Sequence, residues 1–411
     1  MTQSQTMKRQ AMVRRRPGGR RTLLAGCAAL ALAGSGTMAA DAKADIKCNT
    51  LPSPIYGQGG SANTNFLGKI AAAWRTSDKP VALIYQSPGA CVGINSLLSD
   101  TAITGTAFYW EADGTQGTCE LPLLGQKLDF AVMGIDATSC AGIDALPKEF
   151  GDFTGVINSW NLLVPVASSQ QSVSAEALYF VFGFGKAGKA APWTDEEQII
   201  ARNGTSAVQI AIAKAIGVPP AKFVGVDAKT NQATITLLAG SPKPEAAIGF
   251  TSGEVADDNR DVVRTLAYQH TDQICGYWPD STATAFDKSN VRFGQYYLWS
   301  PTHVFTRVGA NGKPSNPNVA LLAGWIDGTV TPPKEVPILD LTIENKNIPK
   351  CAMYVDRSSD SGPLFSVVPD APCGCYFEWK AVGKTDCASC KSDSDCPSSA
   401  PVCRHDFCEV K

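Results

Sequence analysis

Three turns that carry glycine and serine each lead into a helical pattern. The first turn, residues 57–61, precedes the helical pattern 66–74, and the second, 86–90, follows the short apolar run 81–85. A short apolar run between turn signals is typical of a buried strand, and a further strand is predicted at 128–133. A strand, a glycine-bearing turn, a helix and another strand indicate an α/β fold with a parallel sheet.

The third turn, Arg202-Asn203-Gly204-Thr205-Ser206, precedes the helical run 207–217. The free N–H groups of a first helical turn carry partial positive charge and favour an anion. Gly204 lets the backbone approach a guest closely, while Thr205 and Ser206 offer hydroxyl groups. Arg202 adds a forked cation that suits phosphate or carboxylate. Ordinary helix capping would also explain Thr205 and Ser206, so the sequence leaves both interpretations open.

Two further side chains follow predicted strands. Ser87 comes after the strand at 81–85, and Asp136 comes after the strand at 128–133. In open α/β sheets, ligands bind beyond the carboxyl ends of strands, so both residues are candidate ligand contacts. A turn-capping role explains either residue equally well.

Length and charge limit the class of protein. A chain of 411 residues is longer than a domain with a single hydrophobic core usually is, so two or three domains are expected. Its composition, 44% hydrophobic and 18% charged residues, is typical of a globular protein. Residues 1–44 hold eight Lys and Arg residues against Asp41, a net charge of +7. The whole chain has a formal net charge of −2, so the chain after residue 44 has a net charge of about −9. Such an acidic chain argues against a nucleic-acid partner.

The basic N-terminus is predicted to be a signal peptide. Arginines precede the apolar run Leu23–Ala33, and Ala-x-Ala patterns follow at 40–42 and 42–44, where cleavage is expected. Arg20-Arg21 also resembles a twin-arginine export signal. No later apolar run approaches the roughly 18 residues that a membrane span needs. A periplasmic or extracellular location is predicted.

Cysteine usage favours disulfides in an exported protein. Of the 14 cysteines, Cys27 lies in the predicted signal, and the odd remainder implies one free thiol or an intermolecular bond. The five cysteines between 387 and 408 form a disulfide microdomain that requires a partner from an upstream cysteine. The candidate partners are Cys351, Cys373 and Cys375. Zinc at Cys387 and Cys390 is the lesser alternative, because a second ligand pair is missing.

Enzyme motifs are absent from the sequence. The three histidines, His270, His303 and His405, lie far apart, and no His-Glu-x-x-His, Gly-x-Ser-x-Gly or Gly-x-x-x-x-Gly-Lys-Ser/Thr pattern occurs. His303, close to Trp299, is interpreted as a packing or hinge residue. We therefore predict no enzymatic activity, no cofactor and no metal site.

Six segments carry motifs in a fixed order: Tyr56–Ser61, Tyr85–Gly89, Asp129–Ala137, Arg202–Ser206, Ala246–Phe250 and Gly294–Trp299. In this order they resemble the phosphate-binding receptors of bacterial ABC transporters, a branch of the type II periplasmic binding proteins. The resemblance spans roughly residues 48–308 and implies an α/β fold with two lobes. Together with the small disulfide-rich C-terminal tail that the cysteine spacing predicts, the expected parts are a signal peptide at 1–44, lobe 1 at 45–159 and 251–348, lobe 2 at 160–250, and a Cys-rich region at 349–411.

The resemblance also implies a ligand site. Ser87 would donate its hydroxyl, Asp136 would accept a proton from the oxyanion, and Arg202 would supply fixed charge. The full set of implied ligand-binding residues is Ser61, Ser87, Gly89, Asp136, Arg202, Asn203, Gly204, Thr205 and Ser206. The loop after Arg202 is shorter than in the family, and the family's second-lobe acid is either missing or replaced by Asn203. The expected ligand is phosphate or a similar oxyanion.

Two functions follow from these patterns. The first is an exported solute-binding protein that captures a small oxyanion, most readily phosphate, for ABC-type uptake with a permease as partner. The second is a cell-surface or extracellular structural or adhesive protein that uses a binding-protein scaffold and attaches through its Cys-rich tail.

Overall fold

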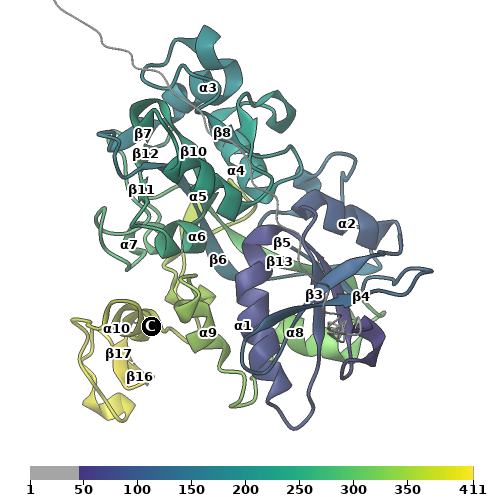
Figure 1. The fold of residues 1–411 in the computed structure, drawn as a ribbon. Helices are drawn as coiled ribbons and strands as arrows, with labels where there is room; N and C mark the ends of the chain where they lie inside the picture. Colours follow the sequence, from purple (N-terminus) through teal and green to yellow (C-terminus); the bar gives the residue numbers. More distant parts are fainter. Residues whose placement is uncertain (1–45, 411) are drawn as a thin grey trace, which may run out of the picture. The chain divides into compact units, whose positions relative to one another are not determined.

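The computed structural model describes residues 46–410, so the predicted signal peptide lies outside the described residues. A nine-stranded sheet forms its centre, with the strand order β10-β6-β13-β5-β1-β2-β3-β4 and β11 paired to β6 (Figure 1). Its strands are β1 (Ile55–Gly59), β2 (Leu83–Gln86), β3 (Thr106–Trp110), β4 (Gln116–Glu120), β5 (Phe130–Met133), β6 (Phe150–Pro165), β10 (Gly249–Ser252), β11 (Val263–Thr265) and β13 (Trp299–Arg307).

The sheet is mixed rather than wholly parallel. Strands β1, β2 and β5 pair in parallel, as the glycine-bearing turns predicted. However, β13 runs antiparallel to both β5 and β6, and β3 and β4 extend the opposite edge as an antiparallel pair. Strand β6 serves two parts of the sheet: its first half pairs with β13, and its last residues pair with β10 and β11.

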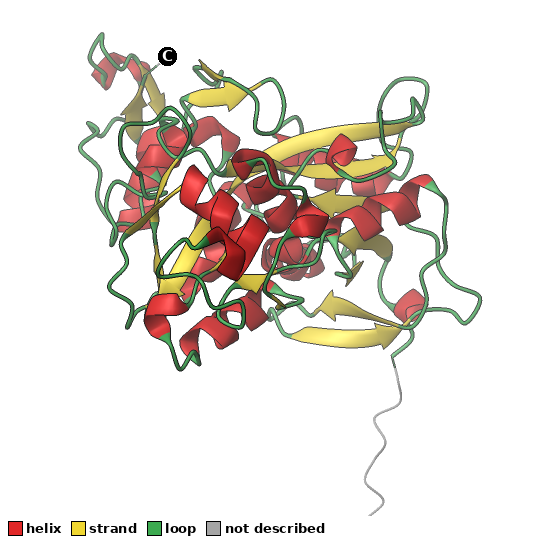
Figure 2. Ribbon diagram, turned by 90° about the horizontal axis from the view of Figure 1, so that it is seen from above, coloured by secondary structure: helices red, strands yellow, loops and turns green. Residues whose placement is uncertain are grey.

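Helices cover both faces of this sheet (Figure 2). Alternate residues of β5 point to opposite sides: Phe130 and Val132 join one apolar cluster, whereas Ala131 and Met133 join another. The first cluster includes α1 (Thr64–Arg75) and α8 (Pro317–Asp327), where Trp74 packs edge-on against Trp325 at 4.6 Å between ring centroids. The second cluster includes α2 (Ala90–Leu98). Burial on both faces explains why these strands read as short, continuous apolar runs.

Seven further α-helices and four short strand pairs complete the described part of the chain. The helices are α3 (Ala175–Phe184), α4 (Ala207–Ile216), α5 (Asn231–Ala239), α6 (Gly253–Asp258), α7 (Ser289–Arg292), α9 (Ile338–Glu344) and α10 (Gly374–Val382). The paired strands are β7 (Ser172–Ser174) with β12 (Ala267–Gln269), β8 (Ile200–Ala201) with β9 (Val226–Asp227), β14 (Val355–Arg357) with β15 (Leu364–Ser366), and β16 (Val402–Arg404) with β17 (Phe407–Glu409). No helix between residues 46 and 410 combines the length and the apolar character that crossing a membrane requires.

The aromatic residues of helix α3 are divided between the core and the surface. Phe182 is buried against Phe223 and Phe250. Tyr179 and Phe180, together with Phe184, are exposed and pack on one another instead. Four aromatic residues within six positions cannot all lie on one side of a helix with 3.6 residues per turn.

Six disulfides lie within the described residues. They are Cys48–Cys119, Cys91–Cys140, Cys351–Cys373, Cys375–Cys387, Cys390–Cys403 and Cys396–Cys408, and Cys275 is the free, exposed cysteine of this part of the chain. Cys375 thus supplies the upstream partner that the tail was predicted to need. These bonds and the sheet confirm an α/β fold with a small disulfide-rich C-terminal tail, and they are consistent with export.

The C-terminal region is docked on the rest of the chain through Arg292. This guanidinium is fully buried, with Nε donating to the carbonyl of Ala352 at 2.9 Å. Its two terminal nitrogens donate to Glu378 Oε1 at 2.9 Å and to the carbonyl of Gly374 at 3.2 Å. One side chain of α7 therefore fixes the first turn and the middle of α10.

Candidate functional site

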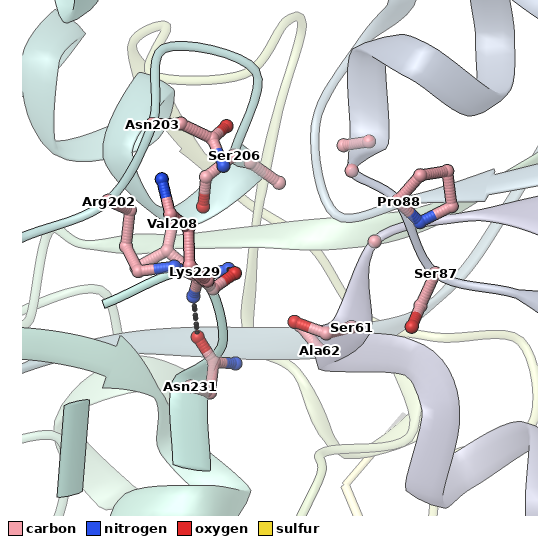
Figure 3. Close-up of a pocket in the computed structure, with 14 residues that line it drawn as sticks. Ser61, Ala62, Ser87, Pro88, Arg202, Asn203, Ser206, Val208, Lys229 and Asn231 are labelled. Carbon is pink, nitrogen blue, oxygen red and sulfur yellow. Dashed lines mark hydrogen bonds between the residues drawn. The ribbon is translucent and has the colours of Figure 1, made fainter. Parts of the chain in front are cut away.

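The three glycine- and serine-bearing turns, far apart in sequence, meet around one small cavity (Figure 3). Its lining residues are Gly60, Ser61 and Ala62 from the first turn, Ser87, Pro88, Gly89 and Ala90 from the second, Arg202, Asn203, Ser206, Ala207 and Val208 from the third, and Lys229 and Asn231. About 20 Å³ is open to the centre of a water-sized sphere. The cavity therefore has room only for a very small ligand.

Each turn connects a strand to the start of a helix. The turns follow β1, β2 and β8 and precede the short helix Ser61–Asn63, α2 and α4. Gly60, Gly89 and Ser206 occupy the N-cap positions, and none of these three starts has a side-chain cap hydrogen bond. Ser206 is therefore at the predicted capping position without capping α4. Uncapped helix starts favour an anion.

The second and third turns touch each other directly. The N–H of Cys91 donates to the carbonyl of Thr205 at 3.3 Å. Gly89 has φ = +141°, a conformation that side chains rarely adopt, and a Cβ there would lie 2.9 Å from Thr205 Oγ1. The Thr205 hydroxyl itself donates to Asn203 Oδ1 at 2.6 Å. The two sides of the cavity are thus in contact, and glycine at position 89 permits that contact.

Arg202 is the buried cation of the site, with only 7% of its surface exposed. It donates through Nη1 to Asn231 Oδ1 and through Nη2 to the carbonyl of Lys229 at 2.8 Å, whereas its buried Nε has no hydrogen-bond partner in residues 46–410. Burial lowers the pKa of Arg202, and the nearby charge of Asp227 raises it in part, which together give a pKa of about 10. The guanidinium therefore stays charged at neutral pH. A charged donor without a partner is well suited to hold an anion.

The lining residues carry positive charge and no carboxylate. Lys229 is the second cation, and its ammonium group pairs with Asp227 at 2.5 Å. Asp227 does not line the cavity. Because Asp227 compensates Lys229 and Arg202 has only a longer-range interaction with the same carboxylate, the cavity has an electrostatic preference for negative charge.

Six of the nine predicted ligand-binding residues line the cavity: Ser61, Ser87, Gly89, Arg202, Asn203 and Ser206. Gly204, Thr205 and Asp136 do not. Asp136 Oδ1 accepts from the N–H of Thr138 at 2.7 Å, which is the turn-capping contact that the sequence left as the alternative. The N–H of Asp136 donates to Asp360 Oδ2 at 2.5 Å, so a residue of the C-terminal region lies against this turn.

Lys229 and Asn231 line the cavity but were not among the predicted ligand-binding residues. Asn231 is the first residue of α5, and Thr230 caps this helix by accepting from the N–H of Ala233 at 3.1 Å. Threonine before a helical run is a recognisable start signal, so a fourth helix start could have been identified. Its position beside Arg202 depends on the tertiary fold.

A buried hydrogen-bond chain extends from Arg202 away from the cavity. Asn231 accepts from Arg202 and donates through Nδ2 to Ser252 Oγ at 2.7 Å, and Ser252 donates to Glu254 Oε1 at 2.5 Å. Glu254 is only 2% exposed, and its other oxygen has no partner among the described residues. Burial raises the pKa of Glu254 to about 8, so this carboxyl group is mostly protonated at neutral pH.

The buried Glu254 predicts a pH-dependent stability. Because its pKa is higher in the folded chain than its ordinary value of 4.5, Glu254 contributes stability that is complete below about pH 4.5 and lost as the pH rises through 8. We expect Glu254→Gln to remove this part of the pH dependence, as measured by urea unfolding between pH 5 and 8. Glu149→Gln, at an exposed position, is the matched control. An unchanged pH profile in Glu254→Gln would contradict the assignment.

No family model matches this sequence, and no curated protein matches it significantly. Among solved structures, the chain is similar to a phosphate ABC transporter substrate-binding protein with bound phosphate from Clostridium perfringens (12% identity, 72% of this chain and 99% of that chain covered, TM-score 0.49). It is also similar to an ABC-type phosphate transport receptor from Vibrio cholerae (14%, 72% and 99%, TM-score 0.46). A third similar structure is the reduced OxyR regulatory domain from Pseudomonas aeruginosa (10%, 69% and 99%, TM-score 0.38). These likenesses concern the fold alone.

Proposed function

We propose that the protein is a solute-binding protein that holds one small oxyanion, phosphate first, where the three strand-to-helix turns meet. The observation that carries this proposal is the convergence of three uncapped helix starts on a cavity beside the buried, charged Arg202. Helix starts and a guanidinium are two independent sources of positive potential, and both are complementary to an oxyanion.

The size of the cavity supports a compact ligand. Pockets for drug-sized molecules measure about 300–1,000 Å³, far more than the 20 Å³ found here. The second and third turns are in contact beside the cavity, where the N–H of Cys91 donates to the carbonyl of Thr205, and Arg202 is only 7% exposed. Enclosure removes water and strengthens the interaction between Arg202 and an anion. Binding without chemical conversion is the role that this arrangement favours.

The proposed setting is outside the cytoplasm. Six disulfides support export, and the predicted signal peptide would provide it through the twin-arginine route that Arg20-Arg21 suggests. We further propose that the bound oxyanion is delivered to an ABC permease. The site residues of this proposal are the six lining residues named above, together with Lys229 and Asn231.

Calorimetric titration tests the proposal directly. The mature protein, dialysed extensively to remove bound anion, is titrated with phosphate and then with sulfate. We expect one phosphate per chain. Because no carboxylate lines the cavity to accept the proton of hydrogen phosphate, we expect sulfate to bind as well. Phosphate binding without sulfate binding would instead place a proton acceptor such as Asp136 at the ligand, and no binding of either anion would refute the proposed function.

A further inference from the structure

A histidine and three aspartates from four separate segments converge on the side of the sheet where β5 ends. His303 lies on β13, Asp152 lies on β6, Asp136 follows β5, and Asp360 lies in the loop between β14 and β15. One potential ligand atom from each of His303, Asp152 and Asp136 lies within 4.8 Å of the others. Asp360 Oδ1 lies 3.5 Å from His303 Nε2. None of the four residues lines the oxyanion cavity.

His303 is buried, with 4% of its surface exposed, and its two ring nitrogens have different surroundings. Nδ1 faces both carboxylate oxygens of Asp152, at 2.8 and 3.0 Å. Nε2 has no hydrogen-bond partner among residues 46–410, although it is buried. A histidine that binds a metal commonly donates its other ring N–H to a carboxylate. Asp152 is placed to fix His303 in this way, so that Nε2 faces Asp360 rather than Asp152.

The distance between His303 Nε2 and Asp360 Oδ1 fits two ligands of one ion better than a hydrogen bond. Hydrogen bonds from nitrogen to oxygen measure about 2.7–3.2 Å. Nitrogen and oxygen ligands lie about 2.0–2.2 Å from a tetrahedral zinc ion, which sets them roughly 3.3–3.6 Å apart. The observed separation is 3.5 Å.

The charges of the cluster also favour a divalent cation. Three carboxylates surround one imidazole, so the cluster remains negative even when that imidazole is protonated. Arg357, whose guanidinium interacts with Asp360, supplies one further positive charge. With His303 neutral, a divalent ion and Arg357 together balance the three carboxylates. The side chains of His303 and Asp360 are the buried members of this cluster, whereas Asp136 is partly buried and Asp152 is exposed.

From these observations we propose that His303 Nε2, Asp360 and Asp136 bind a divalent transition-metal ion of the zinc class, with Asp152 as the positioning residue for His303. Imidazole combined with carboxylates selects this class over calcium and magnesium. The ion joins the loop of the C-terminal region to the end of β5 and to β13. This proposal differs from the prediction, made from sequence, of no metal site and of a packing or hinge role for His303.

Zinc itself is the probe. The full mature chain is stripped with EDTA, dialysed and titrated with Zn²⁺, and we expect one ion per chain. His303→Gln and Asp360→Asn should abolish this binding, and Asp152→Asn should weaken it about 10–100-fold. Unfolding curves recorded without zinc show whether each variant is folded. Cobalt(II) bound in place of zinc should give d–d absorption without a thiolate charge-transfer band.

Other potential ligands are separated by matched controls. Cys390, Cys396 and Cys408 lie near one another, but all three are in disulfides. Cys275 is a free thiol and His405 is a further histidine, but neither belongs to the cluster around His303. Cys275→Ser and His405→Gln should leave the zinc affinity unchanged. If the wild-type chain does not bind zinc, or if His303→Gln and Asp360→Asn bind it as tightly as the wild type, the proposal is overturned. The cluster would then be an ion pair network around a protonated histidine.

Discussion

Replacing Arg202 with alanine is expected to abolish oxyanion binding. The substitution removes the buried cation of the cavity, and with it a donor nitrogen that has no partner among the described residues. Hydrogen bonds to charged groups contribute about 1.5–3 kcal/mol each, and 1.4 kcal/mol corresponds to a tenfold change in affinity. We therefore expect a loss of at least about 100-fold, measured by calorimetric titration with phosphate.

Two further variants make this result specific. Arg202→Lys keeps a positive charge but loses the planar fork that contacts Asn231 and the carbonyl of Lys229, so an intermediate affinity is expected. Arg264→Ala is the matched control, because Arg264 also donates to backbone carbonyls, those of Val166 and Ser168, but does not line the cavity. Undiminished phosphate affinity in Arg202→Ala would rule out the assigned site.

Local sequence patterns predicted the elements of this site well. The third turn and α4 follow from Gly204, from the polar residues before Ala207 and from Gly217, which ends the helix in the left-handed conformation. Strands β2 and β5 follow from apolar runs that are buried on both faces. Such features depend on residues close in sequence, where backbone preferences and burial act together.

Long-range pairing was not predictable in the same way. Nothing in the residues around 304 shows that β13 inserts antiparallel between β5 and β6. The placement of Asp136 outside the cavity, and of Lys229 and Asn231 beside it, likewise depends on how distant segments pack. His303 illustrates the same limit, because its contacts with Asp152 and Asp360 join segments about 150 and 57 residues away.

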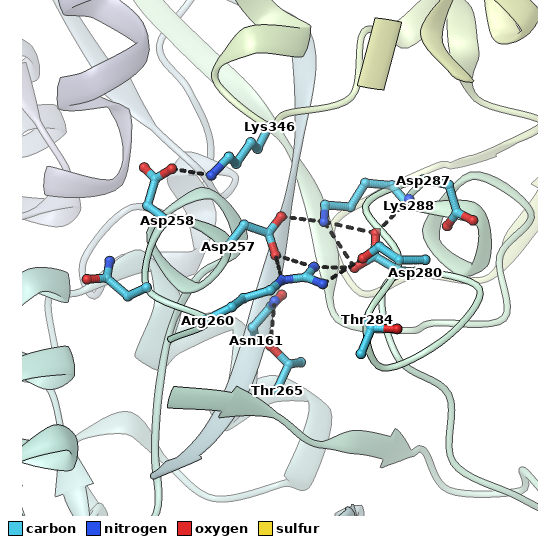
Figure 4. A network of polar contacts seen from close by, with 12 residues as sticks. Asn161, Asp257, Asp258, Arg260, Thr265, Asp280, Thr284, Asp287, Lys288 and Lys346 are labelled. Atoms are coloured by element: carbon cyan, nitrogen blue, oxygen red, sulfur yellow. Dashed lines mark hydrogen bonds and ion pairs between the residues drawn. The ribbon is translucent and has the colours of Figure 1, made fainter. Parts of the chain in front are cut away.

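The second large effect is expected in a buried network of four charges next to α6 (Figure 4). Lys288 Nζ lies 2.5 Å from Asp257 Oδ2 and 3.1 Å from Asp280 Oδ1. Arg260 Nη2 completes the network, at 2.5 Å from Asp257 and 2.7 Å from Asp280. Lys288 is only 2% exposed. The two cations balance the two anions, so removal of one partner leaves a buried charge without compensation.

Lys288→Met is therefore expected to reduce the free energy of unfolding by about 3–5 kcal/mol, the range for breaking one partner of a buried ion pair. Methionine keeps much of the length and volume of lysine, so the loss of charge is the main change. Urea unfolding at pH 7 measures the effect. Lys127→Met is the matched control: Lys127 pairs with Asp100 at the surface, and its loss should cost less than about 1 kcal/mol.

A double variant shows whether the uncompensated charge is the cause. Lys288→Met combined with Asp257→Asn removes one cation and one anion, so the remaining Arg260 and Asp280 stay balanced. We expect the double variant to lose less stability than the sum of the two single variants, as interacting partners do. If the two effects are simply additive, the stability of this region comes from packing rather than from charge balance. Charge balance in this network would then not be what positions α6. Helix α6 carries Glu254, which is linked to Arg202 of the oxyanion cavity through Ser252 and Asn231.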